Sequence, residues 1–164
     1  MPRNFKSTSV FTKPDPKFGS LLATKIVNKI MVGGKKTTAQ KIFYAALEAA
    51  AKKLPELEGE TEEERQESIF VQAIDNIRPS VEVRSKRVGG ANFQVPREVK
   101  RNRQQSLAIR WLVDNSRKKK GKPMHIRLSE ELVDAYNGTG TSVTWKENVH
   151  KMAEANKAYA HFAR

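Results

Sequence analysis

Hydrophobic positions along most of the chain recur three and four residues apart, which is the spacing of amphipathic helices. This pattern predicts six helices, which run from Ser20 to the glycine pair 33–34, from Thr37 or Thr38 to Lys53, from Thr61 to just before Pro79, from Arg97 or Arg101 to Lys119, from Pro123 to Asn137, and from Thr141 or Ser142 to about Tyr159. Their apolar stripes include Leu21 and Ile26 in the first helix, Leu128 and Leu132 in the fifth, and Val149 and Met152 in the last.

The clearest start signal belongs to the third helix. Thr61 followed by Glu64 matches a capping box, in which each of the two side chains accepts a hydrogen bond from the backbone N–H of the other residue. Glu62 and Glu63 add negative charge at the positive end of the helix dipole. We therefore expect this helix to begin at or directly after Thr61.

The hydrophobic period changes from that of a helix to that of a strand at about residues 80–96. Val81 and Val83 alternate with charged residues, Gly89 and Gly90 follow, and alternation resumes up to Pro96. This pattern predicts a β-hairpin with a glycine turn. Because an isolated two-stranded ribbon is marginally stable in water, we expect it to gain order from helices at its base or from a bound partner.

These elements predict a mainly α-helical fold, a bundle of about six helices with one protruding β-hairpin ribbon and a basic, extended N-terminal arm. Residues 1–19 contain Pro2, Pro14, Pro16 and Gly19 without helical periodicity, which indicates the arm. Residues 20–164 are expected to form a single helical domain. No internal repeat is found in the sequence.

Composition restricts the chemistry that the chain can perform. The 164 residues contain no cysteine, which excludes thiolate zinc sites, iron–sulfur clusters and cysteine nucleophiles, and agrees with a reducing compartment. The sequence has neither an apolar run long enough for a membrane span nor a secretory leader, so we expect a cytoplasmic protein without a membrane partner.

Charge is the strongest feature of the sequence, with 31 basic and 18 acidic residues for a net charge of +13. Residues 1–36 carry eight basic and one acidic residue, 78–103 carry eight and two, and 104–123 carry six and one, whereas 37–77 carry four and nine. Such clustered cations favour a polyanion as partner, with nucleic acid ahead of a membrane surface. We predict that the polyanion is contacted by Arg3, Lys6, Lys13, Lys17, Lys25, Lys29, Lys35, Lys36, Arg78, Arg84, Lys86, Arg87, Arg97, Arg101, Arg103, Arg110, Arg117, Lys118, Lys119, Lys120 and Lys122.

An arm, a ribbon and arginine-bearing helix faces suit an irregular folded RNA better than a uniform duplex, although DNA-binding proteins also use helices and ribbons. Two alternatives stay open from the residues themselves, a nucleoid-type DNA-binding protein and an RNA-processing factor. The second requires a cofactor loop, metal ligands or a desolvated acid–base pair. The segment Gly34–Thr37 lacks the first glycine of a phosphate-binding loop, and the three histidines lack metal-ligand spacing, so we expect no catalytic residue, cofactor or metal.

Four segments of the chain resemble the bacterial-type small-subunit ribosomal protein seven family. They are KPDPKFGS (13–20), NKIMVGGKKTTAQKIFYAALE (28–48), NIRPSVEVRSKRVGGANFQVPREVKRNRQQSLAIRWLV (76–113) and HKMAEANKAYAHF (150–162). The resemblance covers nearly the whole chain in order. The acidic segment 54–67 departs from it, because it is longer than the usual connection between the second and third helices, and no contact is assigned to it.

The resemblance implies a helical bundle with a protruding ribbon and a structural role in the ribosome. Members of the family bind the 3′ major domain of small-subunit ribosomal RNA, nucleate assembly of the head, lie near the tRNA exit site and the mRNA path, and meet platform protein eleven. Carried onto this chain, the resemblance implies rRNA contacts by the arm, Lys35, Lys36 and the ribbon arginines. It also implies that the exit site is faced by the ribbon tip and the last helix, through Arg87, Val88, Gly89, Gly90, Ala91 and Lys151.

Overall fold

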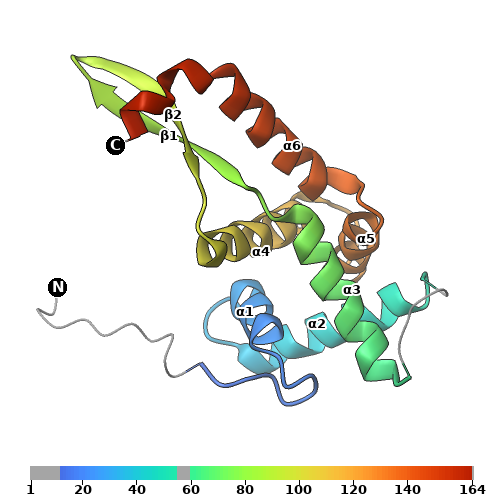
Figure 1. The fold of residues 1–164 in the computed structure, drawn as a ribbon. Helices are drawn as coiled ribbons and strands as arrows, with labels where there is room; N and C mark the ends of the chain where they lie inside the picture. Colours follow the sequence, from blue (N-terminus) through green and yellow to red (C-terminus); the bar gives the residue numbers. More distant parts are fainter. Residues whose placement is uncertain (1–11, 55–59, 164) are drawn as a thin grey trace, which may run out of the picture.

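The computed structural model describes residues 12–54 and 60–163, so Arg3, Lys6 and most of the predicted arm lie outside the described residues. Along the chain follow α1 (Leu21–Ile30), α2 (Lys36–Ala51), α3 (Glu62–Ile77), β1 (Val81–Val88), β2 (Ala91–Glu98), α4 (Arg101–Lys118), α5 (Met124–Tyr136), α6 (Gly140–Ala155) and the 3₁₀ helix η2 (Lys157–Ala163) (Figure 1). The predicted mainly helical fold with a protruding hairpin is confirmed.

Helix α5 occupies the centre of the bundle, where it packs against α2, α3, α4 and α6. Phe43, Phe70, Leu112 and Leu132 are fully buried and bring four of these helices into one core. Burying a side chain of this size contributes about 1.5–3 kcal/mol relative to its exposure. Helix α1 completes the bundle by packing against α2 and α4.

The predicted capping box at the start of α3 is confirmed. The backbone N–H of Glu64 donates to Thr61 Oγ1 over 3.2 Å, and the backbone N–H of Thr61 donates to Glu64 Oε2 over 3.3 Å. Both side chains thus satisfy backbone donors that have no partner within the helix. The helix ends at Ile77, before Pro79, as the sequence predicts.

Two predicted apolar stripes need correction. Leu21 is 51% exposed, because the buried face of α1 is centred on Ile26, Val27 and Ile30, and Leu21 lies well around the helix from it. Met152 on α6 is 50% exposed, whereas Val149 and Ala153 are buried.

Several element ends also differ from the predicted ones. Helix α1 ends before the glycine pair, and Pro123 is the N-cap of α5 rather than a residue of its first turn. Strand β2 continues past Pro96 to Glu98. A proline is tolerated there because each strand of a two-stranded ribbon has an edge that needs no hydrogen-bond donor.

The ribbon pairs β1 with β2 in antiparallel register from Val81 opposite Glu98 to Val88 opposite Ala91. Gly89 and Gly90 form the two-residue turn with φ angles of 58° and 88°. Positive φ at both positions is what a type I′ turn requires, and glycine adopts it without a steric penalty. A side chain at either position would strain the tip.

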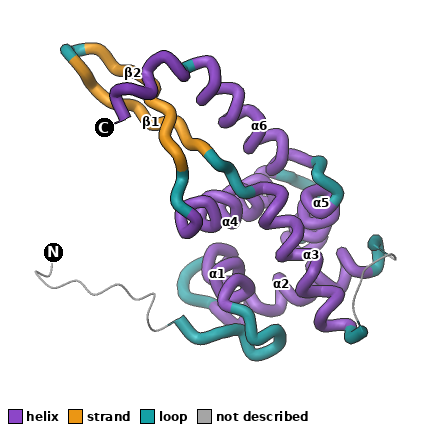
Figure 2. Tube along the Cα trace, viewed as in Figure 1, coloured by secondary structure: helices purple, strands orange, loops and turns teal. Residues whose placement is uncertain are grey.

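Helix α6 and η2 run alongside the ribbon toward its tip, as Figures 1 and 2 both show. The ring of Phe93 on β2 lies 5.1 Å from that of Tyr159 and 5.4 Å from that of Phe162, both on η2. Lys86 Nζ on β1 donates to the carbonyl oxygen of Phe162 over 2.7 Å. The ribbon therefore gains order from the last two helices, and this support extends well beyond its base.

The end of the predicted arm is fixed to the bundle by a buried carboxylate. Asp15 is buried, and its oxygens accept hydrogen bonds from Tyr44 Oη over 2.9 and 3.0 Å and from the backbone N–H of Lys17 over 3.2 Å. Burial, together with the hydrogen bond to Asp15 and its negative charge, raises the pKa of Tyr44 to about 12. The phenol consequently stays protonated as a donor throughout the physiological pH range.

Replacing Tyr44 by Phe should lower the free energy of unfolding by about 1.5–3 kcal/mol, because it removes a donor from a buried charged acceptor. Urea unfolding followed by circular dichroism measures the loss. Tyr136→Phe is the matched control, since its hydroxyl forms no hydrogen bond within the described segments. Equal stability of the Tyr44 variant and the wild type would show that Asp15 does not depend on this donor.

Candidate nucleic-acid interface

One face of the ribbon carries three of the predicted contact residues. Antiparallel pairing places Arg84 opposite Val95 and Glu82 opposite Arg97, so Arg84, Lys86 and Arg97 project on the same side. They line a hollow of about 300 Å³ together with Ser85 and Val95. Three cations around a hollow of this size can hold a phosphate group by charge-assisted hydrogen bonds.

Glu82 connects this face to the helical bundle. Its carboxylate binds Arg84 Nε over 2.8 Å and Arg103 Nη2 over 3.2 Å, so that one acidic residue holds a ribbon arginine and an α4 arginine together. Two positive charges against one negative charge leave the cluster net positive. The pairing orients both guanidinium groups while each keeps donors for a further acceptor.

The ribbon tip and several helix ends present cations that form no ion pair within residues 12–54 and 60–163. At the tip, Arg87 is exposed next to the Gly89–Gly90 turn. The others lie at the start of α2, along α4, directly after α4 and on α6, and they include Lys35, Lys36, Arg101, Arg110, Lys118, Lys120 and Lys151. These side chains are free to neutralise phosphates without first breaking an internal ion pair.

Other predicted contact residues have partners inside the protein. Lys17 Nζ donates to Gln66 over 2.9 Å, Lys29 pairs with Asp114 over 3.2 Å, and Arg78 pairs with Asp75 over 2.8 Å. Lys25 Nζ donates to Gln105. An ion pair on the surface contributes about 0–1 kcal/mol, so a phosphate can compete for these cations at low cost.

The dense basic run 117–122 is divided between structure and surface. Arg117 donates to the carbonyl oxygens of Lys29 and Ile30 over 3.2 and 3.0 Å, which satisfies orphan acceptors at the end of α1. Lys122 pairs with Glu130 on α5. Arg127 donates to the carbonyl oxygens of Arg117 and Lys119 at the end of α4. Clustered cations in this run therefore also close helix ends.

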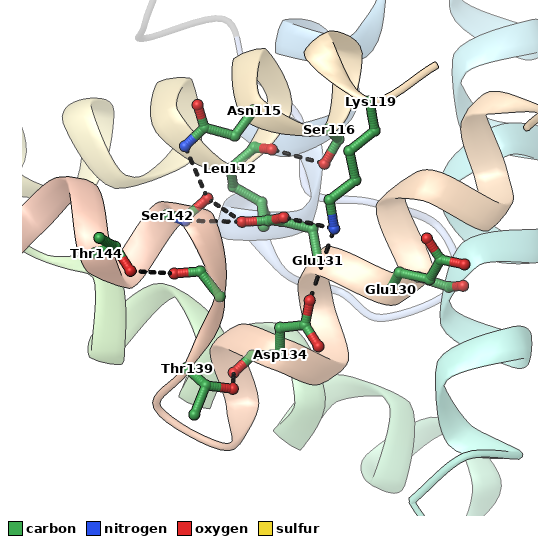
Figure 3. Close-up of polar contacts among 12 residues, drawn as sticks. Leu112, Asn115, Ser116, Lys119, Glu130, Glu131, Asp134, Thr139, Ser142 and Thr144 are labelled. Carbon is green, nitrogen blue, oxygen red and sulfur yellow. Dashed lines mark hydrogen bonds and ion pairs between the residues drawn. The ribbon is translucent and has the colours of Figure 1, made fainter. Parts of the chain in front are cut away.

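Lys119 belongs to a buried polar network between α4, α5 and α6 (Figure 3). Its ammonium, on a side chain 29% exposed, lies 2.8 Å from Glu131 Oε2 and 3.6 Å from Asp134 Oδ2, and the Glu131 side chain is 0% exposed. Burial of the ammonium opposes its charge, but the hydrogen bond and charge of Glu131 outweigh this and raise the pKa of Lys119. Lys119 is therefore held as a structural cation.

Ser142, near the start of α6, completes the network. Glu131 Oε1 accepts from the backbone N–H of Ser142 over 2.8 Å and from its hydroxyl over 2.6 Å, as Figure 3 shows. Asn115 Nδ2 on α4 donates to the same hydroxyl over 3.2 Å. One carboxylate thus fixes the first turn of α6, and with it the helix that supports the ribbon.

Glu131 is not among the functional residues predicted from the sequence. A signal was present, since position 131 lies three residues after Leu128 and four before Ala135 on the buried stripe of α5. A charged residue on such a stripe predicts a buried partner. That partner is one of the lysines that the sequence assigned to RNA.

His150 links α6 to the ribbon base. Its Nε2 accepts a hydrogen bond from the backbone N–H of Ser80 over 3.2 Å, which requires this nitrogen to be unprotonated. Burial, followed by the nearby charge of Lys146, lowers the pKa of His150 below 6.5. Glu98 and Glu154 line a second hollow, at the base of the ribbon, together with His150, and their negative charges do not reverse this shift.

Protonation of His150 should destabilise the fold as the medium becomes acidic. When the pKa of a histidine is lower in the folded state than in the unfolded state, its full contribution to stability is present above the unfolded pKa of 6.5. That contribution is lost as the pH falls through the folded pKa. Across that window the loss is at most about 1.4 kcal/mol per pH unit. Urea unfolding between pH 7.5 and 5 should show a smaller pH dependence for His150→Gln than for wild type. An unchanged dependence would contradict this role, and His161→Gln controls for an exposed histidine.

The described residues contain neither of two further classes of site. No group of three histidine, aspartate or glutamate side chains comes together there as a metal-binding set. None of the helices in these segments combines the length and apolar character needed to cross a bilayer.

A helical bundle with a basic ribbon, and with cations at helix ends that form no ion pair among the described residues, is typical of a nucleic-acid-binding protein of structural type. The sequence matches the family model "Ribosomal protein S7p/S5e" over residues 2–157. The chain belongs to this ribosomal protein family. It is thus a non-enzymatic, rRNA-binding component of the small ribosomal subunit and part of the cytoplasmic ribosome, which confirms the family resemblance drawn from the sequence.

Curated relatives agree with this assignment along nearly their whole length. The chain is similar to "Small ribosomal subunit protein uS7" of Fervidobacterium nodosum, with 53% identity over 149 residues that cover 91% of each chain. The proteins of the same name from Chloroflexus aggregans and Rhodopirellula baltica are each 52% identical, and the matches cover 92% and 91% of this chain and 91% of each relative. The nucleoid and RNA-processing alternatives are set aside by this membership.

Proposed function

We propose that the protein binds the 3′ major domain of small-subunit ribosomal RNA and nucleates assembly of the head. The observation that carries the proposal is the set of exposed cations at the ribbon tip, the start of α2 and both ends of α4, which form no ion pair with any other residue that the structure describes. They are spread over separate elements, and such a spread suits an irregular multihelix junction better than a straight duplex.

Phosphate neutralisation supplies most of the affinity in this proposal, because each contact releases condensed counterions. Shape and 2′-hydroxyl contacts then select the junction. Within the predicted contact set, open cations such as Arg87 and Lys36 meet phosphates directly. Paired cations such as Lys29 exchange an internal partner for RNA, and Lys119 keeps its place in the fold.

The finer location on the subunit is also a proposal. The ribbon tip, Arg87 to Ala91, and Lys151 on α6 face the tRNA exit site and the mRNA path, and platform protein eleven is a neighbour there. This proposed location is supported by the length of the ribbon, because the ribbon carries its tip away from the bundle (Figure 1). Residues 1–19 act as a basic arm on the RNA, and residues 20–164 act as one domain.

The experiment that tests the rRNA proposal removes the ribbon charges. Replacing Arg84, Lys86 and Arg87 by Ala should weaken binding to a 3′-major-domain transcript and lower the slope of log K against log salt by up to about 2–3, because each phosphate contact contributes about 0.7–0.9. Filter binding at several salt concentrations measures both quantities. Hydroxyl-radical footprinting of the wild-type complex should show protection at a junction of the transcript.

A matched control removes the same charge from another face. Lys41, Lys52 and Lys53 are exposed on and after α2, next to the acidic segment, and are not in the predicted contact set. Replacing all three by Ala should leave the slope near its wild-type value. Equal losses in the two triple variants, with helical circular dichroism intact in both, would show that only net charge matters and would overturn the proposal.

A further inference from the structure

Trp145 lies on the outer surface of α6, one turn into the helix, with 43% of its surface exposed. Trp111, the other tryptophan of the chain, is half-buried against the core. An exposed apolar side chain is ordinary by itself. The indole of Trp145, however, has a cation beside it that comes from a different helix.

The Lys118 ammonium, at the end of α4, lies over the Trp145 ring, 4.8 Å from its centroid. This is within the distance of about 6 Å at which a cation is attracted to an aromatic face. Lys118 forms no ion pair within the described segments, and its ammonium donates only a long hydrogen bond, 3.4 Å, to Asn115 Oδ1. Asp114, one turn earlier, pairs with Lys29 instead. Lys120 adds a second exposed cation close by in the sequence.

An exposed aromatic ring with cations beside it is the arrangement that holds an unpaired nucleotide. The base stacks on the ring and the phosphate meets the ammonium. A docked protein helix would instead require a continuous apolar surface. The exposed residues one turn to either side of Trp145 are polar, Thr141 and Asn148, and Met152 lies two turns away, about 10.5 Å at 1.5 Å per residue.

We infer that Trp145 and Lys118 form a stacking site for one unpaired base of the bound ribosomal RNA. The inference rests on the proposed function and adds a contact that does not depend on charge alone. Lys118 is exposed, so its side chain can turn from the ring toward the phosphate of the stacked nucleotide by giving up the long hydrogen bond to Asn115. Trp145 is not among the contact residues predicted from the sequence.

Tryptophan fluorescence tests the site directly. In a Trp111→Phe background, Trp145 is the sole tryptophan, and its emission should be quenched on addition of a 3′-major-domain transcript. Trp145→Ala should weaken binding about 5- to 150-fold, the range for loss of one stacked base, without changing the salt slope. Trp145→Tyr should restore most of the affinity. Lys118→Ala should lower the slope of log K against log salt by about 0.7–0.9, the contribution of one phosphate contact.

Three outcomes separate the possibilities. Wild-type affinity in Trp145→Ala together with unquenched emission would overturn the stacking site while the proposed function stands. Quenching that appears only after other small-subunit proteins are added would overturn it in favour of a protein partner. Failure of the wild-type protein to bind the transcript would refute the proposed function itself and the stacking site with it.

Discussion

The affinity of the protein for a 3′-major-domain transcript should fall by about 10³–10⁵ between 50 and 200 mM salt, the range for a protein that meets six to ten phosphates. The cations without an internal ion pair in the described segments are numerous enough for such a number of contacts, and they include Lys35, Lys36, Arg87, Arg101, Arg110, Lys118 and Lys120. Filter binding or fluorescence anisotropy across the salt series measures the slope.

Specificity requires a comparison at each salt concentration. Duplex DNA and an unrelated folded RNA carry the same phosphate charge, so their binding should show a comparable slope but a lower affinity than the head-domain transcript. A flat salt titration would refute phosphate neutralisation as the main source of affinity. Equal affinity for all three polymers would refute selection by RNA shape.

The arrangement of elements could be predicted from the sequence because local signals set it. The change from helical to alternating periodicity near Pro79, the glycine pair of the hairpin and the Thr61–Glu64 capping box each depend on residues close together in the chain. Errors arose where a helix had apolar residues on more than one face. Leu21 and Met152 are apolar, yet the side on which α1 and α6 pack is decided by tertiary neighbours.

The roles of individual cations could not be predicted, because they depend on partners far away in the sequence. Arg117 closes the end of α1, which lies 87 and 88 residues earlier in the chain, and Glu82 holds Arg103 on a separate helix. Clustered charge correctly indicated a polyanion partner. It did not show that some members of the cluster, above all Lys119, stabilise the protein itself.

The support of the ribbon also depends on residues far away in the sequence. The helical pattern predicts α6, but the contact of Phe93 with Tyr159 and Phe162 joins a strand to the C-terminal 3₁₀ helix more than sixty residues later. Since the start of α6 is fixed by Glu131 through Ser142, the path of the ribbon depends on a buried carboxylate outside it. The structure thus links a charge in the core to the position of the ribbon, the surface proposed to contact RNA.

Replacing Glu131 by Ala should lower the free energy of unfolding by about 3–5 kcal/mol, because removing one partner of a buried ion pair leaves the other unsatisfied. The Lys119 ammonium would keep only its ion pair with Asp134, which spans 3.6 Å in the wild-type protein. The backbone N–H and the hydroxyl of Ser142 would lose their acceptor. Urea unfolding measures the change. Because α6 then loses its anchor, hydrogen exchange should also increase in β1 and β2.

Glu130→Ala is the matched control, since the adjacent carboxylate pairs with Lys122 at the surface and its loss should cost at most about 1 kcal/mol. Glu131→Gln should fall between the two variants, because the amide oxygen still accepts from Ser142 while the charge opposite Lys119 is gone. Lys119→Ala should destabilise the fold yet leave the salt slope of RNA binding unchanged. Two results would contradict this role of Lys119. The Glu131→Ala variant could prove as stable as the Glu130→Ala variant, or Lys119→Ala could lower the salt slope of RNA binding. Either result would place Lys119 among the RNA-contacting residues instead.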